Sequence, residues 1–598
     1  MLSHEAKSEG FSSEAPVKHE YSNDEVGAAE EGGLSNPDHV DLHRALKARH
    51  ITMIAIGGAI GTGLIIGTGD ALAKAGPGSI LIAYAWVGFI VYLVMCALGE
   101  MAAWLPLPSG FTGYAVRFCD PALGFTLGWT YVPHERRISM ASGLEGLHFA
   151  NLEIWRRYWF KYIILSPNQL TAGALVISYW LPQEKVNAGV WITILLVAIV
   201  CINYFGVRFF GEFEFWLSSF KVIVILGIIL LSFILMLGGG PDHDRRGFRY
   251  WKSPGAFNTY ILEGDAGRFL AFWSTMVSAT FAFLGTELVG VTVGEAQNPR
   301  KAIPRAIKLT FWRILVFYIL SVLLVGTLVP YNDKKLPYNN KNFSQATSSA
   351  AASPFVVAIE NSGIPALDHI LNACILLFVF SAANSDLYIA TRTIYGLARE
   401  GKAPRIFART DRRGVPVFAL AICSAIALIA YMNVANDSRV VFKYFVNLVT
   451  IFGLLTWVSI LVTHIYFVRA RRAQNVPDSD LAYVAPFGIW GSYVALAFCI
   501  LIVFTKNYDV FTHNKKWGNF DYKNFITAYL GIPLYLILIF GYKLATKCKG
   551  VKPEEADLWT GKEQIDREEA AFIARHNEEM EKHAGSHWFY RKFVSWLF

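Results

Sequence analysis

The chain is dominated by apolar segments that are long enough to cross a lipid bilayer. A membrane-spanning helix needs about 20 residues, and each such segment must be helical because lipid offers the backbone no hydrogen-bonding partner. The candidate spans are Ile51–Ala73, Ile80–Leu105, a disturbed third segment between Ala122 and Leu181, Val190–Tyr204, Phe215–Leu237, Phe269–Val293, Phe311–Val329, Leu367–Tyr395, Val417–Val434, Phe445–Phe467, Tyr483–Thr505 and Phe525–Leu544. The sequence therefore predicts an all-α integral membrane protein with twelve transmembrane helices in the lipid bilayer.

The composition excludes most other classes of protein. The chain has 598 residues, of which 54% are hydrophobic and 17% are charged, whereas soluble chains are about 25% charged. The net charge of +8 comes from short runs between apolar segments, so nucleic acid is not an expected partner. The seven cysteines are scattered and odd in number, which argues against a disulfide framework. No nucleophile–base or metal-ligand cluster can be assembled from the spans, so we expect no enzyme, no metal and no cofactor.

Polar tails flank the apolar segments. Residues 1–45 contain no apolar run, so we expect a disordered tail without a cleavable signal peptide. We place the membrane domain over residues 46–545 and a second polar tail over residues 546–598. Lys and Arg concentrate in the connections on the N-terminal side of the membrane, which predicts that both termini are cytoplasmic.

The first span contains an unusual number of glycines. Gly57, Gly58, Gly61 and Gly63 fall within seven residues, and each costs roughly 1 kcal/mol of helix propensity relative to Ala. An unwound stretch inside a membrane is tolerated only where it lines a cavity, and such breaks present backbone N–H groups to anionic substrate groups. Close packing against another helix is the alternative explanation.

The sixth span carries an acidic residue in its middle. Glu287 follows Gly285 and Thr286, and an acidic residue at a helix centre costs at least about 2.5 kcal/mol on insertion scales. Glu287 is therefore a candidate for direct function, with a structural hydrogen bond as the alternative. Since the first and sixth spans are five apart and both interrupted, they suggest a five-plus-five inverted repeat with the site where the breaks meet.

Two further sets of polar residues lie within spans. Asn384, Ser385 and Asp386 lie near the inner half of the eighth span, where we favour hydrogen bonding between helices over a substrate or ion role. Glu100 lies near the inner end of the second span, where we expect it in a gate network rather than as a ligand.

Three segments of the chain have a specific combined pattern. They are HITMIAIGGAIGTGLIIGTG at 50–69, FLGTELVGVTVGEAQNPRKAIPRAI at 283–307 and SAANSDLYIATRTIYGLAREGKAP at 381–404. Together they resemble the signatures of fungal amino acid permeases, the yeast amino acid transporter family of the amino acid–polyamine–organocation superfamily. The resemblance implies broken helices 1 and 6 in a ten-helix symporter fold, two extra C-terminal helices, and proton-driven amino acid uptake at the plasma membrane.

The resemblance also implies roles for individual residues. Gly61, Thr62 and Gly63 match the stretch that holds the substrate α-carboxylate, Phe281 matches an aromatic gate, and Ala282 and Leu284 lie where backbone carbonyls receive the α-ammonium group. The substrate-binding residues expected on this basis are Ile60, Gly61, Thr62, Gly63, Lys161, Gln169, Phe281, Ala282, Leu284, Gly285 and Thr286. Glu287 and Glu100 are the expected proton-coupling residues.

Other features resemble the dicarboxylic branch of that family, which takes up glutamate and aspartate. They are the loop at 238–257, the tail at 554–570, and Lys161 and Gln169 in the third span. Many relatives for neutral substrates have a glutamate where Gln169 stands. A lysine ammonium attracts an anionic side chain, although Lys161 could instead pair with an acidic residue or serve in proton coupling.

The third span departs from the family pattern. Residues 132–158 contain seven charged residues, and joining Tyr131 to Trp159 would restore a smooth apolar span. We hypothesise that this stretch is a translated, unspliced intron, with a genuine insertion loop as the alternative. Sequencing the transcript across residues 130–160 tests the hypothesis, and finding only the long form would remove it.

Several functions stay open at this point. The leading one is proton–amino acid symport with a preference for acidic substrates. The alternatives are a broad-specificity permease and a sensor that binds amino acid without moving it. By resemblance to the family, Lys7 and Lys18 are possible acceptors for ubiquitin-ligase machinery, with ordinary solvated charge as the alternative.

Overall fold

A computed structural model describes residues 61–107, 110–128, 158–205, 207–287, 299–336, 353–399, 403–411, 413–434, 438–511, 520–563, 565–567, 569–571 and 573–574. All of them belong to one of the two units of the chain, residues 40–598. The predicted tail at 1–45, Ile60 and nearly all of the stretch at 132–158 lie outside the described residues.

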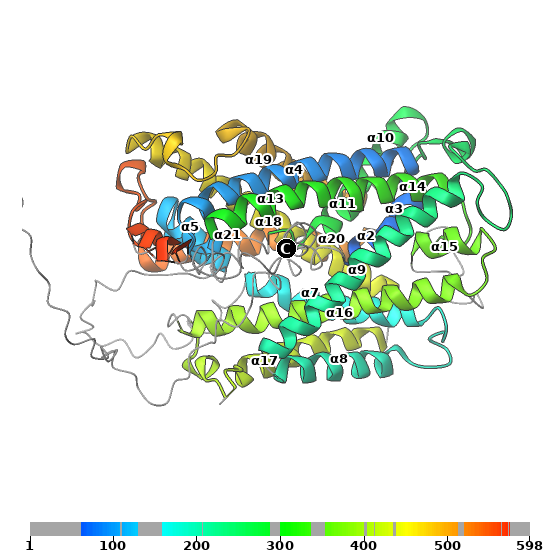
Figure 1. Ribbon diagram of the computed structural model, residues 1–598, viewed down its shortest axis with the longest axis horizontal. Helices are drawn as coiled ribbons and strands as arrows, with labels where there is room; N and C mark the ends of the chain where they lie inside the picture. Colours follow the sequence, from blue (N-terminus) through cyan, green and yellow to red (C-terminus); the bar gives the residue numbers. More distant parts are fainter. Residues whose placement is uncertain are drawn as a thin grey trace, which may run out of the picture. The chain divides into compact units, whose positions relative to one another are not determined.

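The described residues form helices and no β-strand (Figure 1). In chain order the longer elements are α2 (Thr62–Ile65), α3 (Gly67–Ala75), α4 (Pro77–Trp104), α5 (Gly110–Phe118), α6 (Pro121–Gly128), α7 (Tyr158–Ile177), α8 (Ala188–Tyr204), α9 (Val207–Met236), α10 (Gly264–Ser274), α11 (Met276–Phe283), α13 (Pro299–Arg313), η3 (Ile314–Leu320), α14 (Ser321–Leu328), α15 (Pro354–Glu360), α16 (Leu367–Arg399), α17 (Val417–Ala427), η6 (Leu428–Val434), α18 (Ser438–Ala473), α19 (Gly488–Thr505), α20 (Tyr522–Tyr529) and α21 (Gly531–Thr546). Short turns of helix fill several connections: η1 (Trp251–Gly255), η5 (Arg405–Ala408), η7 (Asp478–Asp480), η8 (Tyr508–Phe511) and η9 (Pro553–Glu555).

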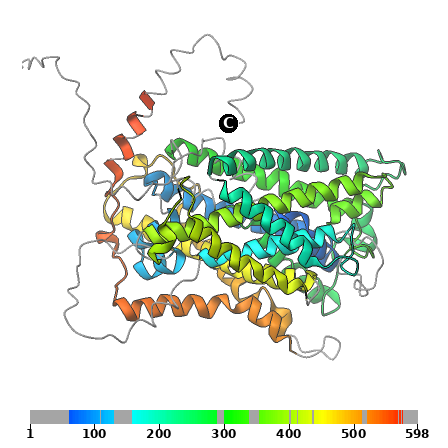
Figure 2. The same ribbon diagram turned by 90° about the horizontal axis from the view of Figure 1, so that it is seen from below.

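Seven described helices are long and apolar enough to cross a membrane, and α20 with α21, bent by 41°, would make an eighth. The apolar helices α7 and α8 are shorter. The protein is thus an all-α integral membrane protein, while the number of twelve spans stays a prediction. Figures 1 and 2 show the long helices lying side by side along one direction.

The long helix α4 runs along one edge of the bundle in Figure 1 and packs against many other helices. Gly76 precedes it with φ of 85°, a conformation that suits glycine, and Pro77 opens the helix, where its missing N–H costs nothing. Its 28 residues extend about 42 Å, and most are buried against α11, α13, α14, α18 and α19. The helix is apolar on all sides, and its unburied side chains, such as Ile82 and Trp86, are exposed on the surface of the bundle.

The two ends of α4 identify two faces of the unit. The N–H of Gly78 donates to the carbonyl oxygen of Ala256 at 2.8 Å, so residues 237–263 lie at one end, here the loop face. The indole N–H of Trp104 donates to the carbonyl oxygen of Leu558 at 3.0 Å, so residues 551–571 lie at the other end, here the tail face. We call residues 551–571 the C-terminal strap.

The C-terminal strap contacts several helix ends. Leu558 is fully buried, and the ring of Trp559 packs edge-on against Trp104 at 5.5 Å. Arg117 of α5 donates to the carbonyl oxygen of Thr560 at 2.8 Å, and Arg300 of α13 pairs with Asp566 and with Glu569. This part of the predicted polar tail is therefore packed against the helices.

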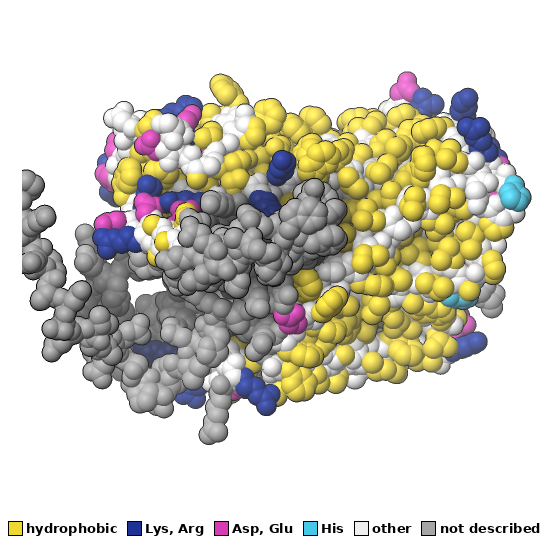
Figure 3. Space-filling view, viewed as in Figure 1, with side chains coloured by type: hydrophobic (Ala, Val, Ile, Leu, Met, Phe, Trp, Pro, Cys, Tyr) yellow, Lys and Arg dark blue, Asp and Glu magenta, His cyan; other side chains and the backbone are white. Residues whose placement is uncertain are grey.

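The middle lengths of the helices expose hydrophobic side chains. Figure 3 shows one face covered by them, with the charged side chains gathered toward the two ends. On α9, for example, Trp216 is 69% exposed and Ile223 68% exposed. Such a surface is stable in lipid rather than in water.

Two described helices flank the anomalous stretch in the third span. Helix α6 ends at Gly128 and α7 begins at Tyr158, and the two helices contact each other. The hypothesis that residues 132–158 are a translated intron stays a prediction, because this stretch lies almost entirely outside the described residues.

Candidate functional site

The sixth span is interrupted twice. Helix α10 ends at Ser274, α11 runs from Met276 to Phe283, and residues 284–287 are not helical. Leu284 is extended, with φ of −62° and ψ of 142°, and Gly285 has φ of 97°, a conformation that residues with a side chain rarely adopt. The glycine seen in the sequence is therefore the residue that allows the predicted break.

The first span begins, within the described residues, at the predicted motif. Gly61 is extended, with φ of −133° and ψ of −160°, and α2 starts at Thr62. The N–H of Ile66 donates to the carbonyl oxygen of Thr62 at 2.8 Å, so α2 continues into α3 with only a local irregularity. The preceding half of the predicted break, including Ile60, lies outside the described residues.

The first span and the interrupted sixth span meet at Gly63. A Cβ atom built on Gly63 would lie 2.5 Å from the Cα atom of Ala282 and 2.9 Å from the carbonyl oxygen of Phe281. Such distances leave no room for a side chain, so the backbones of α2 and α11 are in direct contact. A Cβ on Gly61, by contrast, would have no described atom within 4 Å. The structure thus brings Gly63 against Phe281 and Ala282, which is the close helix packing given as the alternative for the first-span glycines, while the assignment of a substrate site here stays a prediction.

Aromatic side chains surround this contact. Phe281 is 5% exposed, and its ring packs edge-on against that of Phe442 of α18 at 6.1 Å. Phe283 stacks on Tyr318 at 4.5 Å, and the hydroxyl of Tyr84 lies 3.1 Å from that of Thr68. The predicted gate residue Phe281 therefore lies between α11 and α18, beside the start of the first span.

Glu287 is buried and holds the broken segment. Its Oε2 atom accepts a hydrogen bond from the N–H of Gly285 at 3.1 Å and one from the indole N–H of Trp457 at 3.4 Å. The side chain is fully buried. The structural hydrogen bond that the sequence analysis gave as the alternative role of Glu287 is therefore present. A role of the same carboxylate in proton coupling stays a prediction.

The third span contributes buried amides. Gln169 is 5% exposed and its Oε1 atom has no hydrogen-bonding partner among the described residues; the same holds for both amide atoms of Asn168. Thr280 of α11 and Ser385 of α16 likewise have hydroxyl groups without a described partner. Since buried polar atoms normally have partners, these four side chains are candidates for binding a polar ligand. The backbone of Lys161 lies in α7, but its side chain lies outside the described residues.

Glu100 occupies a different position. Its carboxylate accepts a hydrogen bond from the N–H of Ala485 at 2.8 Å and lies 3.3 Å from Nε2 of His464 and 3.2 Å from Nη2 of Arg471. These partners belong to α18 and the segment before α19, near the tail-face end of α4. The gate-network position expected for Glu100 fits this arrangement, while its proposed part in coupling stays a prediction.

One buried ion pair was missed in the sequence. Glu214 and Lys221 of α9 are 0% and 1% exposed and lie 3.9 Å apart, and the hydroxyl of Ser381 of α16 donates to Glu214 at 2.6 Å. The sequence feature that could have identified this pair is the one that identified Glu287, a charged residue within an apolar segment. Glu214 was missed because it lies just before Phe215, where the fifth span was expected to start. A charged pair inside a membrane marks a functional site by default.

The sequence matches the family described as "Amino acid permease" over residues 50–553. The chain belongs to the amino acid permease family. This permease is 52% identical over 581 residues to the dicarboxylic amino acid permease of Saccharomyces cerevisiae, an alignment that covers 96% of this chain and 90% of the yeast protein. It is also 37% identical to the lysine-specific permease of the same yeast, over 89% of this chain and 82% of that protein.

One further relative and one solved structure also match this permease. A proline-specific permease of Emericella nidulans is 37% identical over 89% of this permease and 90% of its own length. Among solved structures, the nucleobase-cation-symport-1 family transporter Mhp1, in a closed conformation with bromovinylhydantoin bound, matches with 15% identity and a TM-score of 0.46, over 90% of this permease and 100% of Mhp1. Membership of the family makes this chain a membrane transporter of amino acids rather than an enzyme.

Proposed function

We propose that this permease is a proton-coupled symporter that imports amino acids across the plasma membrane, with both termini cytoplasmic, and that it prefers glutamate and aspartate. The observation that carries the proposal is the backbone contact between Gly63 and Ala282. Where two interrupted helices meet, unpaired backbone N–H and C=O groups can bind the carboxylate and ammonium groups of an amino acid. Ile60, Gly61, Thr62, Ala282, Leu284, Gly285 and Thr286 are the residues assigned to this task.

The preference for acidic substrates is supported by two further points. The relative that is 52% identical bears the name of a dicarboxylic amino acid permease. In addition, Gln169 is a buried neutral amide and not a carboxylate, so this position adds no negative charge that would repel an anionic side chain. The Lys161 ammonium would add attraction.

Proton coupling is assigned to buried acidic groups. Glu287 lies at the broken sixth span, and the pair Glu214–Lys221 lies on α9, beside Ser381 of α16. Buried carboxylates that change protonation are the usual carriers of protons in transporters. Glu100 is retained as a coupling candidate through its ion pairs at the tail face.

Uptake of labelled glutamate tests the proposal. We would express the permease, with and without residues 132–158, in a yeast lacking its own acidic amino acid transporters, and measure uptake at acidic and neutral external pH. Faster uptake at acidic pH is expected, since protons drive the cycle. Uptake that does not change with external pH would contradict proton symport. Binding of glutamate without any uptake would favour the alternative of a sensor that binds amino acid without transporting it.

Competition separates narrow from broad specificity. Unlabelled aspartate is expected to inhibit glutamate uptake far more than neutral amino acids do, whereas equal inhibition would favour a broad-specificity permease. The variant Lys161→Met should lose acidic substrates more than neutral ones. Lys185→Met is the matched control because Lys185 is an exposed lysine in the turn that follows α7. Equal loss of all substrates in Lys161→Met would make this lysine structural.

A further inference from the structure

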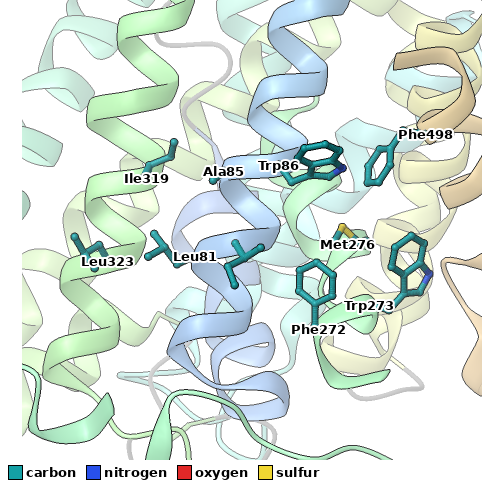
Figure 4. A pocket seen from close by; sticks show the side chains of 10 residues that line it. Leu81, Ala85, Trp86, Phe272, Trp273, Met276, Ile319, Leu323 and Phe498 are labelled. Atoms are coloured by element: carbon teal, nitrogen blue, oxygen red, sulfur yellow. The ribbon is translucent and has the colours of Figure 1, made fainter. Parts of the chain in front are cut away.

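An apolar groove opens on the membrane-facing surface beside the broken sixth span. It has a volume of about 740 Å³ and is lined by side chains of α4, α10, α11, η3, α14 and α19 (Figure 4). The lining consists almost entirely of carbon atoms. At the rim, Ile82 and Trp86 of α4 are 49% and 43% exposed, while Met276 at the inner wall is fully buried. The groove therefore reaches from the lipid-facing surface to the core.

Aromatic rings make one wall of the groove rigid. The ring of Trp86 packs edge-on against Phe498 of α19 at 5.5 Å, and Phe498 packs edge-on against Trp273 of α10 at 6.2 Å. The indole N–H of Trp273 donates to the hydroxyl of Thr505 at 2.9 Å. Because this bond uses its polar atom, Trp273 presents only carbon to the groove, and the three rings form a fixed wall.

The chemistry of the lining selects the occupant. Water is unsuitable because a buried water needs two to four polar partners, and a polar solute would lose its hydrogen bonds. Leu81–Trp86 lie four to nine residues after Pro77, about 6–14 Å along the helix, at a depth where the leaflet on the loop face consists of hydrocarbon.

We propose that this groove is a binding site for one acyl chain of a phospholipid in the loop-face leaflet. The chain would fill the space between Ala85, Met276 and Leu323 and lie against the wall formed by Trp86, Phe498 and Trp273. The acyl chain supplies the van der Waals contacts that the lining side chains would lack in an empty groove. The phospholipid headgroup stays at the membrane surface. Acyl-chain binding does not rest on the proposed substrate or on proton coupling.

The position of the groove links the lipid to transport. Phe272, Trp273 and Met276 flank Thr275, where α10 ends and α11 begins. The N–H and the hydroxyl of Thr275 both donate to the carbonyl oxygen of Phe272, at 3.1 and 2.7 Å. A chain in the groove therefore packs against the joint of the helix whose far end, at Phe281, contacts Gly63. The bound lipid supports this joint while the broken segment binds and releases substrate.

Photocrosslinking in lipid nanodiscs tests the site directly. The full-length permease is reconstituted with phosphatidylcholine that carries a diazirine in the middle of one acyl chain, irradiated and mapped by peptide mass spectrometry. Crosslinks should concentrate on peptides that contain Ile82–Trp86 and Phe272–Met276, at least threefold above peptides of α8. Equal labelling of α4 and α8 would show only ordinary contact with the bilayer and would overturn the proposal.

Two groove-filling variants and one control complete the test. Ala85→Phe should lower crosslinking at the groove at least threefold, and Leu323→Trp, on the opposite wall, should do the same if Ala85→Phe folds poorly. Val197→Phe adds a ring on α8, at a side chain that is 56% exposed, and should leave crosslinking unchanged. Unaltered crosslinking in both filling variants would refute the site, as would displacement of the acyl probe by a sterol in preference to unlabelled phosphatidylcholine.

Discussion

Gly63 of α2 and Ala282 of α11 pack so closely that a Cβ atom at Gly63 would lie 2.5 Å from the Cα atom of Ala282. The neighbouring atoms are backbone atoms of Ala282 and Phe281, which cannot rotate away as the end of a flexible side chain could. The first and sixth spans are therefore held at a separation that only glycine permits. This contact fixes the geometry of the proposed substrate site.

Gly63→Ala should destabilise the permease and abolish uptake. Inserting a methyl group into a filled position typically costs about 1–3 kcal/mol, and here the added methyl would force the two spans apart. Thermal unfolding of the detergent-purified protein, followed by tryptophan fluorescence, measures the effect. Gly61→Ala is the control because no described atom lies within 4 Å of its Cβ position and its φ of −133° suits any residue. Equal melting temperatures for the two variants would contradict the close contact.

Glu287→Gln and Glu287→Ala should differ from each other. Glutamine keeps an oxygen that accepts from the N–H groups of Gly285 and Trp457, so the fold should be retained while uptake loses its dependence on external pH. Alanine leaves both donors unsatisfied, and each such group costs about 1–3 kcal/mol. Uptake at acidic and neutral pH, together with thermal unfolding, separates the two effects. A Glu287→Gln variant with normal pH dependence would assign Glu287 a purely structural role.

The pair Glu214–Lys221 should show strong coupling in a double-mutant cycle. Removing one partner of a buried ion pair costs about 3–5 kcal/mol. Lys221→Met and Glu214→Met should therefore each destabilise strongly, while the double variant should be closer to the parent than either single variant. Thermal unfolding in detergent gives the comparison. Additive effects would show that the two side chains do not interact.

The loop face should be insensitive to pH across the neutral range. The side chain of Arg249 donates to Asp244 at 3.0 and 2.6 Å, and these hydrogen bonds lower the pKa of Asp244. Because the pKa is below that of an unfolded aspartate, about 3.9, the contribution to stability is complete above that value and is lost only as the pH falls through the lowered pKa.

Limited proteolysis of the loop face measures this dependence. In the parent, cleavage within residues 238–262 should stay constant from neutral pH down to about pH 4, the range set by the aspartate pKa. Arg249→Gln should move the onset of sensitivity to higher pH, since the pKa of Asp244 then rises. An identical pH profile in the variant would show that the pair does not stabilise the loop.

Two arginine substitutions should distinguish the C-terminal strap from an exposed tail. Arg300 of α13 pairs with Asp566 and Glu569 and is 19% exposed at its side chain, so Arg300→Ala should loosen the strap and speed its proteolysis. Arg567 pairs with Glu563, but both side chains are about four-fifths exposed. Such exposed pairs contribute about 0–1 kcal/mol, so Arg567→Ala should have little effect. Equal cleavage of both variants would contradict a packed strap.

The sequence was most informative where a residue was unsuited to its surroundings. Glycines in the first span and Gly285 with Glu287 in the sixth are costly in an ordinary transmembrane helix, and the described structure places Gly63 at the contact with the sixth span, next to Phe281 and Ala282. Gly285 has a positive φ, and Glu287 accepts from the backbone of the broken segment. Such features can be predicted because the cost is local and visible in one stretch of chain.

Other features depend on partners far away in the sequence. The C-terminal strap is as polar as a disordered tail. It is packed because Leu558 and Thr560 accept hydrogen bonds from Trp104 and Arg117, which lie more than 440 residues earlier in the chain. The short helix α5 was likewise not predicted, because Gly110–Phe118 is too short to be recognised as a span. The side-chain position of Lys161 lies outside the described residues, so its role stays a prediction.

The C-terminal strap also bears on how this permease is engineered. A fluorescent reporter or purification tag joined soon after α21, at residues 547–550, would replace the segment that covers Trp104 and contacts Arg117 and Arg300. The resulting fusion would expose an apolar surface at the end of α4 and leave the positive charges of Arg117 and Arg300 without these partners at the ends of α5 and α13, which would favour aggregation during extraction. Fusions for localisation or for screening should therefore begin after residue 574.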